Sequence, residues 1–375
     1  MKIPIVWLLA AVAPVAAAPA TVWIGTFGKG DAAGIYRADL DQATGNLSVP
    51  VKVAAMADAG FLALAADGKH AFSTGSGPGP DGKPGGLIAA WKRGHGAEPW
   101  KLLGTGSGGG ELCHVSVAPD GNTVMAANYS DGSVVSFRFD EAGGLGPRVG
   151  FARHTGKGPN PARQQAAHAH AIVPLPGGDF AAAADLGIDT VVVYAWDRRT
   201  SSLKEHGRVA TPPGSGPRHV AVHPDGKMVY VVNELDNTVS VFGWDAGAGK
   251  LTPRQVADAR PTGMPQEDLA SAEIRIRGDG RFLYTSTRDL SPRRRDFLTV
   301  FRVDAGGNLT PVQHAPAGVS IPRNFALSPD GRWLLAGGQR SNSIRVHAVD
   351  PATGKLTLSG DAVMCPAPVC FIVEP

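Results

Sequence analysis

Short apolar runs alternate with polar turns along most of the chain, and one arrangement of them repeats. The clearest unit, at 219–251, reads HVAVHPDGKMVYVVNELDNTVSVFGWDAGAGKL. It predicts a first strand, a Pro-Asp-Gly turn, a second strand, a polar loop, a third strand ending in Asp, and a glycine turn before a fourth strand. Residues 228–232 are apolar at every position, which is typical of a strand in a sheet covered on both faces.

The same order of strands and turns recurs elsewhere in the chain. One copy starts at residue 326 and reads ALSPDGRWLLAGGQRSNSIRVHAVDPATGKL, and another starts at residue 113 and reads CHVSVAPDGNTVMAANYSDGSVVSFRFDEAGGL. Looser copies contain Asp67-Gly68, Gly177-Gly178 and Asp279-Gly280. A period of about fifty residues with four strands per unit predicts the blades of a β-propeller, since one such sheet cannot bury both of its own apolar faces.

The two ends of the chain supply the remaining blade. The segments TVWIGTFG (21–28) and GIYRADLDQATGNL (34–47) match the second and third strands of the repeat, but no first strand precedes them. The last residues, PVCFIVEP (368–375), resemble that missing strand. We therefore predict an all-β fold, a seven-bladed propeller of four-stranded antiparallel blades, closed by pairing of the C-terminal strand with the N-terminal blade. The alternative is an open array of six blades with a disordered tail.

The first eighteen residues have a different composition from the rest. Lys2 is followed by an uncharged, mostly apolar stretch at 3–18, and Val15-Ala16-Ala17 places small residues where a signal peptidase cleaves. We predict a signal peptide at 1–18 and a propeller domain at 19–375, which puts the mature protein in the periplasm or outside the cell. A buried N-terminal helix or a tethering anchor are the alternatives.

Charge and cysteine content narrow the partners only slightly. The formal net charge is +3 without a basic or acidic tail, so we expect no nucleic-acid partner and no membrane span in the mature protein. Cys365 and Cys370 could form a disulfide in an oxidising compartment or remain buried thiols. Cys113 is expected to be a small buried apolar residue rather than a nucleophile.

The repeat also predicts where polar side chains meet. The Pro-Asp-Gly turns lie on one face of the disc, so the first strands begin and the second strands end on the opposite face, near the central channel. The polar residues at strand beginnings are His114, His168, His170, Arg218, His219, Arg323 and Asn324, and those at strand ends are Asn128, Asp185, Glu234, Arg288 and Gln339. Such a ring suits an anionic or polyhydroxy small molecule. Polar residues that are merely solvated in a wet channel are the alternative.

Other sequence features carry less information. His168 and His170 have a spacing compatible with a metal, but no third ligand is evident, so we expect neither a metal nor another cofactor. The glycine-rich run at 104–110 lacks a phosphate-loop pattern and is expected to be a loop. The stretch at 75–86 is expected to be an unusually long loop beside the pocket.

Three segments resemble the propeller-type lactonase family. They are GPRHVAVHPDGKMVYVVNEL from residue 216, HAHAIVPLPGGDFAAAADLGIDTVVVYAWD from residue 168, and IPRNFALSPDGRWLLAGGQRSNSIRVHAVDPATGKL from residue 321. This family includes bacterial 6-phosphogluconolactonases and is related to the fungal carboxy-muconate lactonizing enzymes. The resemblance covers essentially the whole predicted mature chain.

The resemblance implies an exported lactonase that hydrolyses a sugar-acid or organic-acid lactone without a cofactor. Matching motifs assign catalysis to His170, Arg218, Glu234 and Arg288, and the remaining residues of the polar ring are then candidates for substrate binding. An exported enzyme would be separated from cytoplasmic 6-phosphogluconolactone, which argues for another lactone. The alternatives are a non-enzymatic envelope propeller that binds a ligand or protein, and a muconate-type lactonizing enzyme.

Overall fold

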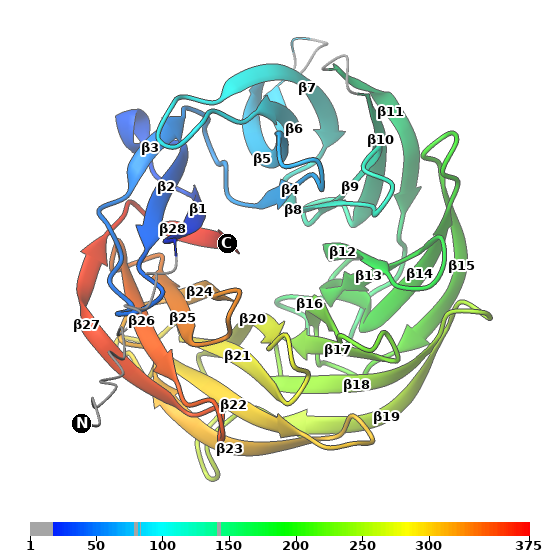
Figure 1. The fold of residues 1–375 in the computed structure, drawn as a ribbon. Helices are drawn as coiled ribbons and strands as arrows, with labels where there is room; N and C mark the ends of the chain where they lie inside the picture. The colour runs from blue at the N-terminus through cyan, green and yellow to red at the C-terminus, as the bar shows by residue number, and fades with distance from the viewer. Residues whose placement is uncertain (1–17, 79–81, 83, 141–143) are drawn as a thin grey trace, which may run out of the picture.

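Seven four-stranded antiparallel sheets surround a central channel (Figure 1), so the predicted fold class is confirmed. The computed structural model describes residues 18–78, 82, 84–140 and 144–375. The only helices in these ranges are the two short 3-10 turns η1 (Gly30–Ala32) and η2 (Leu186–Ile188). Within the same ranges, no helix is long and apolar enough to cross a membrane.

The blades are numbered here in chain order, starting with the one that contains β1. Each blade is given from its innermost to its outermost strand. Blade 1 consists of β28 (Pro368–Glu374), β1 (Ala20–Thr26), β2 (Ile35–Leu40) and β3 (Val51–Ala54); blade 2 of β4 (Leu62–Leu64), β5 (His70–Pro78), β6 (Pro84–Lys92) and β7 (Lys101–Gly109); blade 3 of β8 (Leu112–Val117), β9 (Thr123–Asn128), β10 (Ser133–Asp140) and β11 (Gly144–Arg153); and blade 4 of β12 (Ala169–Leu175), β13 (Phe180–Asp185), β14 (Thr190–Trp196) and β15 (Leu203–Ala210). Blade 5 consists of β16 (Pro217–Val222), β17 (Met228–Asn233), β18 (Thr238–Asp245) and β19 (Lys250–Asp258); blade 6 of β20 (Leu269–Ile276), β21 (Phe282–Asp289), β22 (Phe297–Val303) and β23 (Leu309–Pro316); and blade 7 of β24 (Pro322–Leu327), β25 (Trp333–Gly338), β26 (Ser343–Val349) and β27 (Leu356–Met364).

Aromatic side chains tie successive blades together. The hydroxyl of Tyr230 in blade 5 donates to the carbonyl of Gly307 in blade 6, at 3.0 Å. Tyr284 repeats the contact from blade 6 to Gly354 of blade 7, also at 3.0 Å. In each case an apolar ring packs between two sheets while its polar atom reaches a turn of the neighbour. The repeat in the sequence therefore becomes a repeat of contacts around the ring.

A bulge at the start of the innermost strand directs side chains into the channel. In β16, Pro217 pairs with Asn233 and His219 pairs with Val232, so Arg218 is an extra residue in the strand. The same shift occurs at the start of β8, β12 and β24. Because a bulge re-aims the side chains beside it, the consecutive residues Arg218 and His219 both reach the central cavity.

Closure of the ring joins the two ends of the chain. Strand β28 pairs antiparallel with β1 from Thr21–Glu374 to Thr26–Pro368. Glu374 adds a side-chain latch, because its carboxylate accepts from Trp23 Nε1 at 2.6 Å and from Arg93 Nη1 at 3.2 Å. Arg93 belongs to blade 2, so one carboxylate links the C-terminal strand to two blades.

Loss of this latch should measurably weaken the closed ring. We expect Glu374→Ala to lower the melting temperature by roughly 2 °C, since a partly exposed ion pair with an indole bond contributes about 1 kcal/mol. Differential scanning calorimetry would measure the shift, with the exposed Asp361→Ala as a matched control. Equal melting temperatures for the two variants would mean that backbone pairing alone holds the ring shut.

Two expectations about glycine-rich segments are wrong. Residues 104–109 belong to the outermost strand β7, and the run turns only at Gly109, where φ is +98°. The stretch at 75–86 extends the hairpin of β5 and β6 as far as the pair Pro78–Pro84. Both segments have partners across the sheet whose hydrogen bonds outweigh the low strand preference of glycine. The hairpin thus forms a wall of the cavity rather than a loose loop.

The predicted signal peptide falls on residues 1–17, which lie outside the described residues, and on Ala18. Cys113, Cys365 and Cys370 are free thiols. Burial raises the pKa of each of them to about 12, so they remain protonated at neutral pH.

Candidate active site

A cavity of about 1010 Å³ opens on the face where the innermost strands begin. Its lining includes residues from the starts and bulges of the innermost strands, among them Leu112, Cys113, Arg218, His219 and Arg323. The hairpin of β5 and β6 and the loop after β1 form its walls. The cavity is therefore a concave, mostly pre-formed site at the mouth of the channel.

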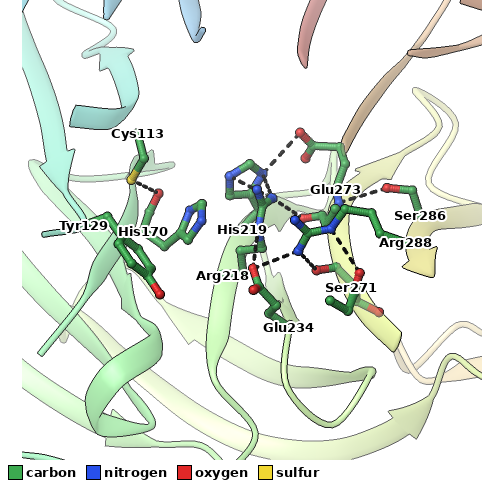
Figure 2. Close-up of polar contacts among 12 residues, drawn as sticks. Cys113, Tyr129, His170, Arg218, His219, Glu234, Ser271, Glu273, Ser286 and Arg288 are labelled. Carbon is green, nitrogen blue, oxygen red and sulfur yellow. Dashed lines mark hydrogen bonds and ion pairs between the residues drawn. The ribbon is translucent and has the colours of Figure 1, made fainter. Parts of the chain in front are cut away.

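Glu234, just beyond the end of β17, contacts three arginines, of which Figure 2 shows Arg218 and Arg288. Its Oε2 lies 2.9 Å from Arg218 Nε and 3.0 Å from Arg288 Nη2, and its Oε1 lies 2.7 Å from Arg163 Nη2. Burial alone would raise the pKa of Glu234, but the guanidinium groups, Arg288 and Arg218 above all, hold it well below its usual range. Glu234 is thus a permanent anion that orients cations.

Backbone carbonyls at the start of β20 hold two of these arginines. Arg218 Nη1 donates to the carbonyl of Ala272 at 2.5 Å, and Arg288 Nε donates to that of Ala270 at 3.1 Å. Burial, then the neighbouring Arg288 and Arg323, lower the pKa of Arg218 to about 9, which still leaves it charged at neutral pH. Arg218 is 2% exposed and lines the cavity, so its charge faces any bound ligand.

Three imidazoles pack together beside these arginines. The ring of His219 lies with its centroid 5.2 Å from that of His170 and 5.6 Å from that of His114. Burial, reinforced by Arg218, keeps the pKa of His170 and of His219 well below 6.5, and burial lowers that of His114 to about 3. The three rings are therefore neutral at physiological pH.

Four of the twelve predicted ring residues line the cavity, namely Arg218, His219, Arg323 and Gln339. The guanidinium of Arg323 lies 5.6 Å from the ring of Phe27. His168 stacks on Tyr129 with a centroid separation of 4.6 Å. Asn324 is buried deeper, where its side chain accepts from the backbone N–H of Phe371 at 3.0 Å.

Asn128 and Asp185 are two predicted residues that do not reach the cavity. Asn128 donates to the carbonyl of Gly108 and to Ser133, at 2.8 and 2.9 Å. The carboxylate of Asp185 pairs with His154 at 2.6 Å. Both side chains are fully buried and hold their own or an adjacent blade together. Each is the last residue of its strand, one position of the repeat before that of Glu234, and successive residues of a strand point in opposite directions.

The sequence pattern did not predict three polar residues of the channel: Tyr129, Arg163 and Glu273. Glu273 occupies the same position of the repeat as His219 and Asn324, six residues before the turn Asp, and aligning the looser blade 6 would have found it. Arg163 comes from the loop between β11 and β12 and bonds the hydroxyl of Tyr129 at 3.1 Å. That loop has no counterpart in the repeat, so no sequence signal marked it.

Together these groups form a cationic pocket beside neutral proton acceptors. A pre-set guanidinium suits a developing oxyanion or a bound carboxylate, and a neutral imidazole suits proton transfer. Among the residues that the structure describes, no group of three His, Cys, Asp or Glu side chains is placed to hold a metal ion. The chemistry that these side chains offer is acid–base and electrostatic.

Comparison with known proteins agrees with this arrangement. The model of the family described as lactonase, 7-bladed beta-propeller, matches residues 21–373. The chain is 33% identical over 350 residues to a 6-phosphogluconolactonase of Bacillus subtilis, covering 93% of this chain and 96% of that protein. A 6-phosphogluconolactonase of Formosa agariphila is 31% identical over 341 residues, covering 89% and 94%.

A solved structure resembles the whole propeller. The periplasmic gluconolactonase of Pseudomonas aeruginosa superposes with a TM-score of 0.87 at 30% identity, covering 95% of this chain and 99% of the other. The prediction of a lactonase-type enzyme is confirmed at the level of the family. On its fold, its family match and its full-length relatives, this chain belongs to the seven-bladed β-propeller lactonases.

Proposed function

We propose that this protein hydrolyses the lactone of a sugar acid or another small organic acid. The observation that carries the proposal is the placement of Arg218, charged and buried, on the cavity wall beside the neutral ring of His219. A lactone carbonyl beside Arg218 would have its developing negative charge stabilised, and an adjacent imidazole could take a proton from the attacking water.

The four residues matched by motif have distinct parts in this proposal. Arg218 and Arg288 stabilise the oxyanion that develops on the lactone carbonyl. Glu234 fixes both guanidinium groups and, with its pKa held low by them, does not serve as the base. His170 lies beside His219 and takes part in proton transfer. Arg323 and Gln339, which line the cavity, contact the substrate.

The substrate is proposed to be an unphosphorylated lactone met outside the cytoplasm. Support comes from the apolar, Lys-led segment at 1–18 and from the relative in Pseudomonas aeruginosa, which is described as periplasmic and as a gluconolactonase. Cell fractionation with an antibody against the protein tests the location, and recovery in the cytoplasm with residues 1–18 intact would refute export.

A lactone panel tests the activity itself. Purified protein lacking residues 1–18 is added to glucono-1,5-lactone, 6-phosphogluconolactone and an aromatic-acid lactone, and acid release is followed in a pH-stat. We expect turnover of the sugar lactone well above its spontaneous hydrolysis, and faster than that of the phosphorylated lactone. No acceleration with any lactone would defeat the proposal, and reaction only with muconate, followed by absorbance, would indicate a lactonizing enzyme instead.

A further inference from the structure

Beneath the cavity lies a buried carboxylate that the four motif-matched residues do not explain. Glu273, in the bulged start of β20, has no solvent exposure. Its Oε1 accepts from the backbone N–H of Ile274 at 2.9 Å, and its own N–H donates to Ser286 at 3.1 Å. Figure 2 shows the carboxylate directed toward the ring of His219. Burying a carboxylate costs free energy unless hydrogen-bond donors or cations are held beside it, so the residues around Glu273 must supply such partners.

The remaining oxygen of Glu273 has three side-chain partners. Oε2 lies 3.2 Å from His219 Nδ1, accepts from the side-chain amide of Asn324, and lies 3.4 Å from Arg275 Nη2. Since a carboxylate only accepts, Nδ1 must carry the hydrogen of the neutral ring. Nε2 is then left with its lone pair. Arg218 Nη1 lies beside the ring, 3.2 Å from Nε2 and 3.3 Å from Nδ1.

His219 differs from the other two histidines in its access. It lines the substrate cavity and also a second, smaller chamber of about 210 Å³ farther along the channel, whose wall includes Phe61, His114 and Arg275. His170 lines neither chamber. The Nδ1 atoms of His114 and His170 have no hydrogen-bond partner in the described part of the chain. Only His219 among the three has a carboxylate to fix its tautomer.

We infer that Glu273 is a positioning residue for His219, and that His219 Nε2 is the atom that takes the proton from the hydrolytic water. This inference rests on the proposed lactone hydrolysis. The arrangement is that of a carboxylate, an imidazole and a reacting oxygen, in which the carboxylate sets the tautomer and stabilises the imidazolium once it forms.

The proton and electron pairs balance over two steps. The water oxygen bonds to the carbonyl carbon, its proton passes to His219 Nε2, and the carbonyl π pair moves to the oxygen beside Arg218. The tetrahedral species then re-forms the carbonyl, the ring C–O bond breaks with its pair on the departing oxygen, and the imidazolium returns the proton to that oxygen. The product is the open hydroxy acid, and Glu273 stays ionised throughout.

Glu273→Gln is the direct test, with Arg275→Gln as the matched control. Arg275 lies 3.4 Å from the same carboxylate but makes no bond to His219. We expect Glu273→Gln to lower kcat roughly 100-fold with little change in KM, and Arg275→Gln to change kcat less than about threefold. Equal losses in the two variants, or a loss in KM alone, would overturn the positioning role.

A readout that needs no substrate separates this inference from the proposed function. In ¹⁵N-histidine NMR spectra of the wild-type protein, His219 should be the Nδ1–H tautomer, and Glu273→Gln should shift or mix it. An Nε2–H ring in the wild type would refute the inference whether or not lactones are hydrolysed. Conversely, a wild type with the expected tautomer and no lactonase activity would refute only the proposed function.

His219→Ala covers the case in which Glu273→Gln does not fold. We expect kcat to fall roughly 1000-fold and to recover in part when imidazole is added, because the cavity can readmit the ring. Full activity without imidazole would exclude His219 as the proton acceptor, and so would a loss that imidazole leaves unchanged in a folded variant.

Discussion

Replacing Arg218 by Ala should lower kcat/KM by roughly 100- to 1000-fold, the usual effect of losing one group that stabilises an oxyanion. The fold should survive, because Glu234 keeps two of its three guanidinium partners, Arg288 and Arg163. The variant loses the positive charge that the bulge of β16 places on the cavity wall. Steady-state kinetics on the best lactone of the panel would measure the effect.

Two further substitutions sharpen this test. Arg218→Lys keeps a charge but loses the fork that contacts Glu234 and Ala272 together, so its activity should fall between those of the wild type and the alanine variant. Arg281→Ala removes an exposed arginine beside the Asp279-Gly280 turn on the opposite face and should leave kcat/KM unchanged. Near-normal turnover of Arg218→Ala would remove this arginine from the mechanism.

The fold could be predicted from the sequence because the same local sequence pattern recurs from blade to blade. An Asp-Gly turn, an all-apolar second strand and a polar loop recur at fixed offsets, so a single well-preserved copy at 219–251 defines the rest. The same register predicted that Arg218, Glu234 and Arg288 would share one face. In the structure, Arg218 Nε and Arg288 Nη2 lie 2.9 and 3.0 Å from the same carboxylate oxygen of Glu234.

The sequence could not predict contacts made by segments that lie outside the repeat. Arg163 reaches Glu234 from a loop between blades, and its approach depends on how that loop packs rather than on any strand register. The predicted ring also mixed two adjacent positions of the repeat. Asn128 ends β9 as Asn233 ends β17, and both donate to hydroxyls of their own blades, whereas Glu234 lies one residue farther along and binds arginines.

Neutralising Glu234 should have the largest effect on stability. In Glu234→Gln, three guanidinium groups remain gathered around a neutral amide, and breaking a buried ion pair in this way costs about 3–5 kcal/mol. Activity should fall as well, because Arg218 and Arg288 lose the anion that fixes their direction. Urea unfolding followed by tryptophan fluorescence would give the free energy of unfolding.

The pH dependence of this loss provides a check on its origin. Because the pKa of Glu234 in the folded protein is far below its unfolded value of about 4.3, its stabilising contribution is fully present above that value and is lost as the pH falls toward the folded pKa. The difference in unfolding free energy between wild type and Glu234→Gln should therefore be constant from pH 7 to about 5 and shrink in more acid solution.

The exposed pair of Glu205 and Arg208 supplies the control, since Glu205→Gln should cost less than about 1 kcal/mol. A loss at Glu234 no greater than that at Glu205, or one that grows as the pH falls, would mean that the three arginines do not depend on its charge.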